Sequence, residues 1–134
     1  MQRLSVSTHQ RSEMIDITAE VRRVVRDRGV ESGHVIVYVP HTTAGVTINE
    51  NADPDVQHDF LQQLDEMVPW DQPFYQHGEG NSAAHVKASM MGFDATVLID
   101  GGDLVLGTWQ GIYFCEFDGP RTRNVLVQAS TNSE

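Results

Sequence analysis

Tight turns join most of the strand-like segments in this sequence, and this constrains the fold more than any other feature. Strand signals over 95–99, 104–117 and 125–129 are separated by the turn sequences 100–103 (DGGD) and 118–120 (DGP). Strands joined in this way run antiparallel, because a parallel neighbour needs a long crossover connection. The sequence therefore predicts antiparallel sheets and disfavours a doubly wound parallel sheet.

Helix signals are few and short. A first helix is expected to begin at Thr18 as its N-cap, and Asp53-Pro54 predicts the start of a second, since Asp is a preferred N-cap and Pro a preferred first helical residue. A third helix is predicted over 82–91 and is closed by Gly92. These helices are too few to serve as the repeated crossovers of a parallel sheet.

Strand signals occupy much of the remaining chain. Segments 4–8 and 14–17 flank a polar turn and predict a hairpin. Segment 34–39 is apolar at both odd and even positions, which predicts a strand covered on both faces by a helix, a second sheet or a neighbouring subunit. The order strands, helix, strands, helix, strands favours a strand-rich α+β fold. In it, two mainly antiparallel sheets pack together with two to three helices as a single domain over 1–134.

The composition limits the classes of partner. The 134 residues carry a formal net charge of −10, which disfavours nucleic acid and anionic membrane surfaces. The N-terminus lacks a secretory signal and no apolar run is long enough to span a membrane, so the expected location is the cytoplasm. The single cysteine, Cys115, excludes an intrachain disulfide and a thiolate zinc cage, so a metal site would use histidine, carboxylate or carbonyl ligands.

The first candidate site lies in segment 41–51. If this segment forms one strand, alternate side chains share a face. One face then carries His41, Thr43, Thr47, Asn49 and Asn51. Histidine and asparagine are poor strand formers but good ligands, so the pattern favours a binding site. The alternatives are a solvent-exposed sheet face, or a bulge at Gly45 that breaks the alternation.

The second candidate site is segment 77–85. Its glycines allow the backbone to approach a ligand, and the start of the predicted third helix offers free N–H groups to an anion. Neutral imidazoles are common transition-metal ligands. His41, His77 and His85 together are therefore candidate ligands for a zinc-like divalent ion with one open coordination position. They come from distant segments, and no consensus spacing supports the group.

The third candidate site is segment 106–117, together with two arginines that follow the turn over 118–120. Trp109 is expected in the core, and Cys115 is expected to be a buried, unreactive thiol in an apolar strand. Glu116 has the opposite parity, which would let it reach a polar site. Arg121 and Arg123 are the best candidates for holding a phosphate, although pairing with surface carboxylates is equally expected in so acidic a chain.

Taken together, segments 41–56, 77–85 and 106–116 resemble the YjbQ-like family, and the resemblance extends over nearly the whole chain. This family is also described as the secondary thiamine-phosphate synthase family. The resemblance implies an α+β, strand-rich homotrimer with sites near the subunit boundaries. It also implies synthesis of thiamine phosphate from a hydroxymethylpyrimidine diphosphate and a thiazole phosphate, with loss of pyrophosphate.

The residues that match the family motifs lie in all three segments. They are His41, Asn49, Glu50, Asn51, Asp55, His77, Glu79, Gly80, His85, Gly107, Trp109, Gln110, Cys115 and Glu116. The leading hypothesis is an enzyme acting on a phosphorylated heterocycle, with Glu50, Glu79 or Glu116 as the catalytic base. The expected substrate-binding residues are Asn49, Asn51, Asp55, Gly80, Trp109, Gln110 and Arg121.

Two other hypotheses are compatible with the same residues. In one, the site stores or senses a metal ion or a metabolite without turnover. In the other, the histidine and asparagine side chains hydrogen-bond to one another across a trimer interface, and replacing His77 by Ala would break the trimer.

Overall fold

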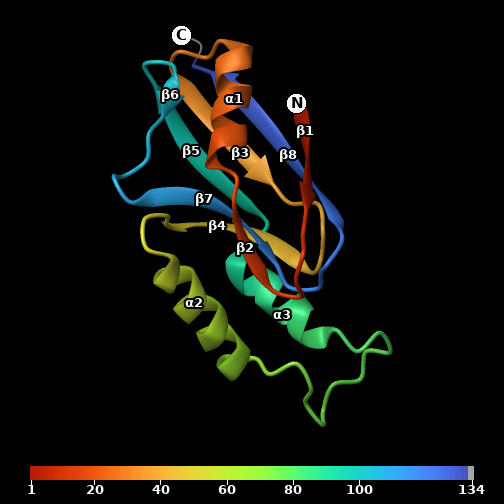
Figure 1. Ribbon diagram of the computed structural model, residues 1–134. Coiled ribbons are helices and arrows are strands. Elements are labelled where there is room, and N and C mark those ends of the chain that lie inside the picture. Colours follow the sequence, from red (N-terminus) through yellow and green to blue (C-terminus); the bar gives the residue numbers. More distant parts are fainter. Residues whose placement is uncertain (133–134) are drawn as a thin grey trace.

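The structure is a computed structural model that describes residues 1–132, and in this range it contains two antiparallel sheets and three helices (Figure 1). The helices are α1 (Thr18–Arg28), α2 (Pro54–Met67) and α3 (Ser82–Met91). The strands are β1 (Gln2–Ser7), β2 (Glu13–Asp16), β3 (Gly33–Tyr38), β4 (Ala44–Glu50), β5 (Asp94–Asp100), β6 (Asp103–Leu104), β7 (Gln110–Glu116) and β8 (Thr122–Thr131). The predicted strand-rich α+β class is confirmed.

The larger sheet has five strands in the order β1-β8-β3-β5-β6, and the smaller has three in the order β2-β7-β4. The last strand of the chain, β8, lies between β1 and β3, so Arg3 pairs with Leu126 on one side and Ile36 pairs with Gln128 on the other. The predicted turn over 100–103 joins β5 to β6, with Asp100 opposite Asp103.

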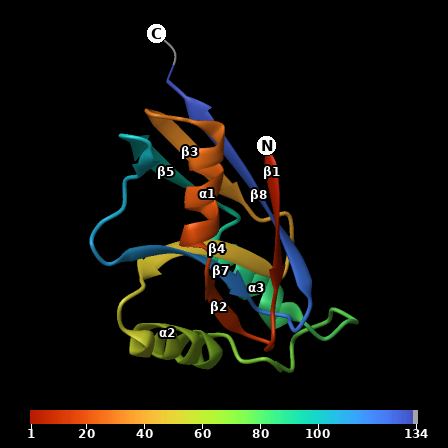
Figure 2. The same cartoon turned by 45° about the horizontal axis from the view of Figure 1, so that its top comes forward.

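The main core lies between the two sheets and α1. Alternate residues of β3 and β8 point inward, among them the fully buried Val35, Val37, Val125 and Val127. They contact α1 and the inner face of the smaller sheet, which contributes Phe114. Figure 2 shows α1 lying across β3, β5 and β8.

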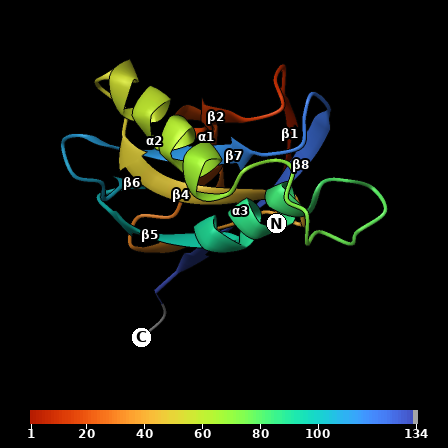
Figure 3. The same ribbon diagram turned by 90° about the horizontal axis from the view of Figure 1, so that it is seen from below.

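A second core lies on the other face of the smaller sheet. There Leu64 of α2 and Ala84 and Ala88 of α3 pack with Tyr113 and Cys115 of β7. Figure 3 shows α2 and α3 on this outer side of β4 and β7. The smaller sheet is therefore covered on both faces, and β7 contributes to both cores.

The helix ends follow the sequence signals except at one position. Asp53 caps α2 by accepting a hydrogen bond from the Asp55 N–H at 2.9 Å, with Pro54 in the first turn. Thr18 does not cap α1 but is its first residue. Its hydroxyl instead donates to Asp16 at 2.6 Å and accepts from the Ile112 N–H at 2.8 Å, which ties α1 to β7.

Two predictions of strand pairing are wrong. The N-terminal segments do not form a hairpin, because β1 pairs with β8 in the larger sheet and β2 pairs with β7 in the smaller one. Segment 104–117 is not one strand, since β6 belongs to the larger sheet and β7 to the smaller. In both cases a local pattern shows that a strand forms but does not reveal that the chain crosses from one sheet to the other.

The outer face of the larger sheet is not covered by any element of the described chain. It exposes the large apolar side chains of Ile36, Tyr38 and Leu98, the last with 62% of its surface exposed. Within one chain, therefore, β3 is covered on one face, and cover of its other face by a neighbouring subunit stays a prediction. In residues 1–132, no helix has the length and apolar character needed to cross a membrane.

Candidate functional site

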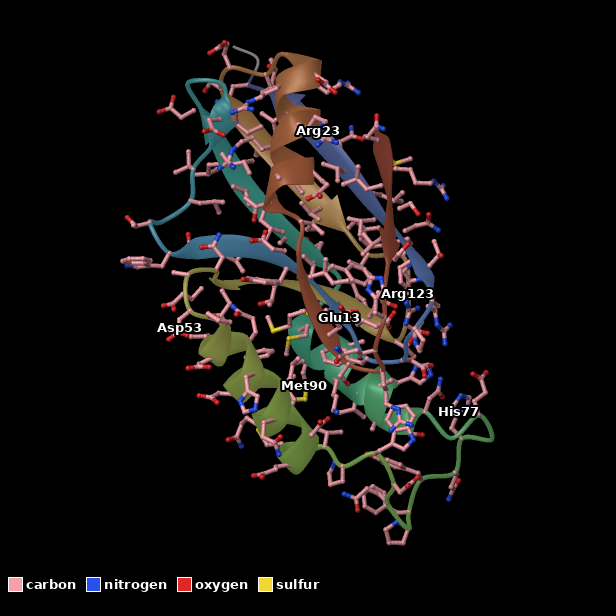
Figure 4. The ribbon with its side chains drawn as sticks, viewed as in Figure 1. Glu13, Arg23, Asp53, His77, Met90 and Arg123 are labelled. Atoms are coloured by element: carbon pink, nitrogen blue, oxygen red, sulfur yellow. The ribbon has the colours of Figure 1, made fainter. Side chains whose placement is uncertain are left out.

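A pocket of about 650 Å³ opens where the loop before α3, the segment after β3 and the turn before β8 meet. His41, His77 and His85 line it together, and so do Glu79 and Arg121. We call this cavity the histidine pocket. Figure 4 shows His77 on the loop beside α3 and Arg123 above it at the start of β8. The structure thus brings together three histidines that are far apart in the sequence.

His77 and His85 form a close pair at one side of the pocket. Their ring centroids are 5.3 Å apart and the rings are nearly perpendicular, at 87°. His77 lies in the loop and His85 in the first turn of α3, so the helix start fixes one ring beside the other. The Glu79 carboxylate lies 3.9 Å from the Nε2 of His77. Gly80, whose φ of 72° is left-handed, allows the turn in which its N–H donates to the His77 carbonyl.

Asn81 connects this loop to the turn before β8. Its side-chain amide donates to the Asp118 carboxylate at 2.8 Å and to Glu79 at 3.4 Å. Its Oδ1 is buried and has no hydrogen-bond partner, and it is the one such side-chain atom in residues 1–132. Arg121 donates to the same Asp118 carboxylate at 3.1 Å. Arg121 is therefore paired with a carboxylate but stays half exposed at the pocket.

His41 also lines the pocket and is held by the backbone. Its Nε2 accepts a hydrogen bond from the Asn124 N–H at 2.9 Å. Burial, together with the nearby positive charge of Arg123, lowers the pKa of His41 below 6.5. His41 is therefore a neutral imidazole at neutral pH.

A buried ion pair supports the pocket from behind. The Glu116 carboxylate is fully buried and accepts from Arg123 Nε at 2.9 Å and from Thr8 Oγ1 at 2.9 Å. Arg123 also donates to Thr43 Oγ1 at 2.7 Å. Burial by itself would raise the pKa of Glu116, but the hydrogen bonds from Arg123, the Asp118 N–H and Thr8 outweigh it and lower the pKa. Glu116 therefore holds Arg123 in place and does not line the pocket.

The strand predicted over 41–51 is shorter than expected. Because β4 begins at Ala44, His41 does not alternate with Asn49 and Asn51, which lie toward the opposite end of the strand. Gly45 is not a bulge, since it pairs regularly with Cys115 of β7. A Cβ at Gly45 would lie 2.6 Å from the carbonyl oxygen of Gly92, so the close approach of α3 requires glycine here.

The remaining predicted substrate residues lie away from the histidine pocket. Asn51 and Gln110 line a second cavity of about 730 Å³ near the start of α1. Asp53 at the start of α2 and His77 lie on different sides of the molecule (Figure 4). Asn49, Glu50 and Asp55 lie near Asp53, at the end of β4 and the start of α2, and so belong to the side of the molecule away from His77.

Hydrogen bonds in this second region stabilise a turn. The Gln110 side chain accepts from the Gly107 N–H at 2.8 Å, and the Asn51 N–H donates to the Trp109 carbonyl at 2.9 Å. This turn directs Trp109 outward, with 62% of its surface exposed, so the prediction that Trp109 is a core residue is wrong. Asn49 accepts from the Glu50 N–H at 2.7 Å. The predicted residues thus fall into two groups and do not form one site.

Three residues of the pocket region have no signal in the sequence that would assign them to it. The sequence identifies Tyr38 only as a strand residue and Asp118 only as a turn residue. Nothing in the sequence singles out Asn124. Asp118 and Asn81 are 37 positions apart, and Asn124 and His41 are 83 positions apart. No local pattern signals such contacts.

The comparisons with known proteins place this architecture in one family. The family model described as UPF0047 protein YjbQ-like matches residues 2–132. UPF0047 protein YugU of Bacillus subtilis is 54% identical over 93% of this chain and 95% of that protein. UPF0047 protein MJ1081 of Methanocaldococcus jannaschii is 47% identical over 92% of this chain and 88% of that protein.

Solved structures agree with the sequence relatives. An uncharacterized conserved protein of the YjbQ/UPF0047 family from Clostridium acetobutylicum has a TM-score of 0.95 and 52% identity, over 97% of this chain and 100% of that one. A conserved hypothetical protein from Thermus thermophilus has a TM-score of 0.90 and 40% identity, over 97% and 100% of the two chains. This chain, with its two sheets and its histidine pocket, belongs to the YjbQ-like UPF0047 family.

Proposed function

We propose that this protein is an enzyme that acts on a small phosphorylated heterocycle in the histidine pocket. The observation that carries the proposal is the meeting of three imidazoles and the Arg121 guanidinium around one open cavity. Imidazoles bind divalent cations and transfer protons, and guanidinium groups bind phosphate oxygens. This combination suits a phosphate-bearing substrate and agrees with the activity that the sequence resemblance implies.

The His77 and His85 pair fits a divalent metal ion. A tetrahedral zinc ion with Zn–N bonds of about 2.0–2.1 Å holds two coordinating imidazole rings with their centres roughly 5 Å apart. The observed separation of 5.3 Å is close to this value. In residues 1–132, no three His, Cys, Asp or Glu side chains form a complete group around one point. The further coordination positions would therefore fall to water or to substrate oxygens.

Among the three proposed catalytic glutamates, Glu79 is the best placed to act as a base, which hydrolysis of a phosphorylated substrate would require. It lines the pocket, and its side chain is 74% exposed next to His77, so it can reach a bound substrate. Glu116 is fully buried and its oxygens are engaged by Arg123, Thr8 and backbone N–H groups. Glu50 lies at the far end of β4.

The reaction we propose first is thiamine phosphate synthesis. The ring nitrogen of a thiazole phosphate would form a bond to the methylene carbon of a hydroxymethylpyrimidine diphosphate. The bond from that carbon to the diphosphate oxygen would break, and pyrophosphate would leave with the electron pair. A bound divalent ion supplies charge neutralisation for such a leaving group. Arg121 would contribute a guanidinium at the same pocket.

The test combines metal content and turnover. Bound metal per chain is measured by plasma mass spectrometry, and product is measured with the two thiamine precursors and, separately, as phosphate released from phosphorylated heterocycles. His77→Ala and His85→Ala are expected to lose metal and product formation. His58→Ala is the matched control, because His58 is exposed on α2.

The outcomes separate the proposal from its alternatives. Product formation that depends on His77 and His85 but not on His58 supports an enzyme. Saturable binding of precursors without any product would instead identify a non-catalytic binding module. Loss of the oligomer in His77→Ala would instead favour a structural role for the histidines.

We also propose that the chain forms a homotrimer through the uncovered face of the larger sheet. Ile36, Tyr38 and Leu98 expose apolar surface there, and Tyr38 also lines the histidine pocket, so the site would lie near a subunit boundary. Leu98→Glu should reduce the mass measured by light scattering to that of one chain. Met67→Glu is the control and should keep the oligomer, because Met67 is an exposed apolar residue at the end of α2, on the outer side of the smaller sheet.

A further inference from the structure

The hydrogen bond between His41 and Asn124 completes the sheet where β3 ends. The pairing of β3 with β8 stops at Tyr38 and Leu126. Alternate residues of a strand direct their backbone groups to the same neighbour, so Asn124 faces the place where β3 would continue. The chain leaves the sheet there, and His41 Nε2 accepts the Asn124 N–H in place of a strand carbonyl.

This contact fixes which ring nitrogen of His41 carries the proton. A neutral imidazole has one donor nitrogen and one acceptor nitrogen. Because Nε2 accepts the Asn124 N–H at 2.9 Å, the proton of the neutral ring lies on Nδ1. Partial burial and the positive charges of Arg123 and, to a smaller extent, Arg121 favour the neutral ring. The Nε2 lone pair is occupied by a backbone donor and is not free for a metal ion.

The Nδ1–H group of His41 is left for a ligand. Within residues 1–132, this nitrogen makes no hydrogen bond. The one buried side-chain polar atom without a partner in this range is Asn81 Oδ1, so Nδ1 of the half-buried His41 stays open to solvent. The ring lines the histidine pocket together with Arg121. A neutral N–H donor beside a guanidinium group is suited to an anionic oxygen and repels a cation.

We propose that His41 is a positioning and substrate-binding residue that donates its Nδ1–H to a phosphate oxygen of the substrate, and that it is not a metal ligand. In this arrangement the pocket has two chemically distinct sides. His77 and His85 would offer ring nitrogens to a cation, while His41 and Arg121 would offer donors to an anion. The inference rests on the proposed function for the identity of the anion, but the tautomer of His41 follows from the fold alone.

Two substitutions separate the two nitrogens of His41. His41→Asn places an amide N–H close to the position of Nδ1 and removes the acceptor for Asn124, whereas His41→Gln places its terminal amide near Nε2 and leaves no donor at Nδ1. Inorganic phosphate is the probe, and its affinity is measured by calorimetry. We expect His41→Asn to bind phosphate within about threefold of wild type. We expect His41→Gln to bind at least about tenfold more weakly, the usual effect of one hydrogen bond to a charged group.

The tautomer is measured directly on wild-type protein labelled with ¹⁵N in its histidines, from the long-range couplings between ring nitrogens and carbon-bound protons. We expect His41 to be protonated on Nδ1. Protonation on Nε2 overturns the inference, and so does phosphate binding that is absent in wild type or equally weakened in both variants. If the tautomer and the phosphate affinities are as expected while no precursor is converted, the inference stands and the proposed enzymatic function fails.

Discussion

Arg123 and Glu116 form an ion pair in the interior, in which the arginine reaches the glutamate with both Nε and Nη2 and neither side chain is more than 3% exposed. Arg123 extends the inward-facing row of β8, and Glu116 is the last residue of β7, so the pair links the two sheets. It also fills the space directly behind the histidine pocket.

Replacing Arg123 by Met should be strongly destabilising. The substitution leaves the Glu116 carboxylate buried without its partner, and breaking a buried pair in this way costs about 3–5 kcal/mol. The free energy of unfolding is measured by urea denaturation. The control is Arg22→Met, which removes the partly exposed Arg22–Asp103 pair and should cost no more than about 1 kcal/mol. Equal losses in the two variants would contradict the structural role of the buried pair.

The protonation of His41 should depend on Arg121. Its pKa is below 6.5 because of burial, Arg123 and, to a smaller extent, Arg121. Arg121→Met removes one positive charge and should raise the pKa of His41 toward 6.5. The ring is titrated by NMR in metal-free protein. Arg23→Met on α1, remote from the pocket in Figure 4, should leave the pKa unchanged. A pKa of His41 that is the same or lower in Arg121→Met would refute the assignment.

The same shift has a consequence for stability. When the pH falls below 6.5, the unfolded chain binds a proton at His41 before the folded chain does, so protonation favours unfolding. The stability contributed by neutral His41 is therefore present above pH 6.5 and is lost as the pH falls through the lower pKa of the folded state. In Arg121→Met the pH interval between the folded-state pKa of His41 and 6.5 should become narrower. The free energy of unfolding, measured by urea denaturation at a series of pH values, would show this change.

Cys115 should be unreactive in the folded protein. It is fully buried in the second core, and burial raises the pKa of its thiol to about 12. A thiol reagent such as a disulfide dye should therefore modify it only at the rate at which the protein opens. The same reagent in urea should react at once. Rapid labelling under native conditions would mean that β7 is accessible, contrary to the structure.

A side chain at position 45 should push α3 away from β4. In Gly45→Ala the new Cβ would lie 2.6 Å from the Gly92 carbonyl oxygen and 3.0 Å from Met91 Cβ, and overpacking of this kind costs about 1–3 kcal/mol. Since α3 carries His85, metal binding should weaken as well. Gly78→Ala is the control, because no atom lies within 4 Å of the new Cβ. A neutral effect at Gly45 would show that α3 can shift freely.

Local chemistry was enough to predict several elements and part of the site. Asp53-Pro54 starts α2 and Gly92 ends α3 because capping depends on neighbouring residues only. His41, His77 and His85 were grouped on ligand chemistry, and they do line one pocket. The sequence does not predict the tautomer of His41, because the tautomer depends on where β3 leaves the sheet.

The errors have a common physical origin. A single strand over 41–51 would place Asn49 and Asn51 on one face with His41, but β4 begins only at Ala44. Gln110 is expected there from the family resemblance, yet its side chain stabilises a turn at Gly107. Trp109 was expected in the core from its size, yet the turn around it directs the ring outward. Which strands are neighbours depends on contacts between distant parts of the chain, and a local pattern carries no information about them.

The position of β8 has a consequence for how the protein folds as it is synthesised. β1 leaves the ribosome long before β8, which is its one neighbour in the larger sheet within residues 1–132 and lies more than a hundred positions later. Until β8 emerges, β1 and β3 each present an unpaired edge that favours aggregation. The larger sheet can therefore assemble only after β8 has been synthesised. Folding should be slow for a chain of this size, because the contacts that join its strands are non-local.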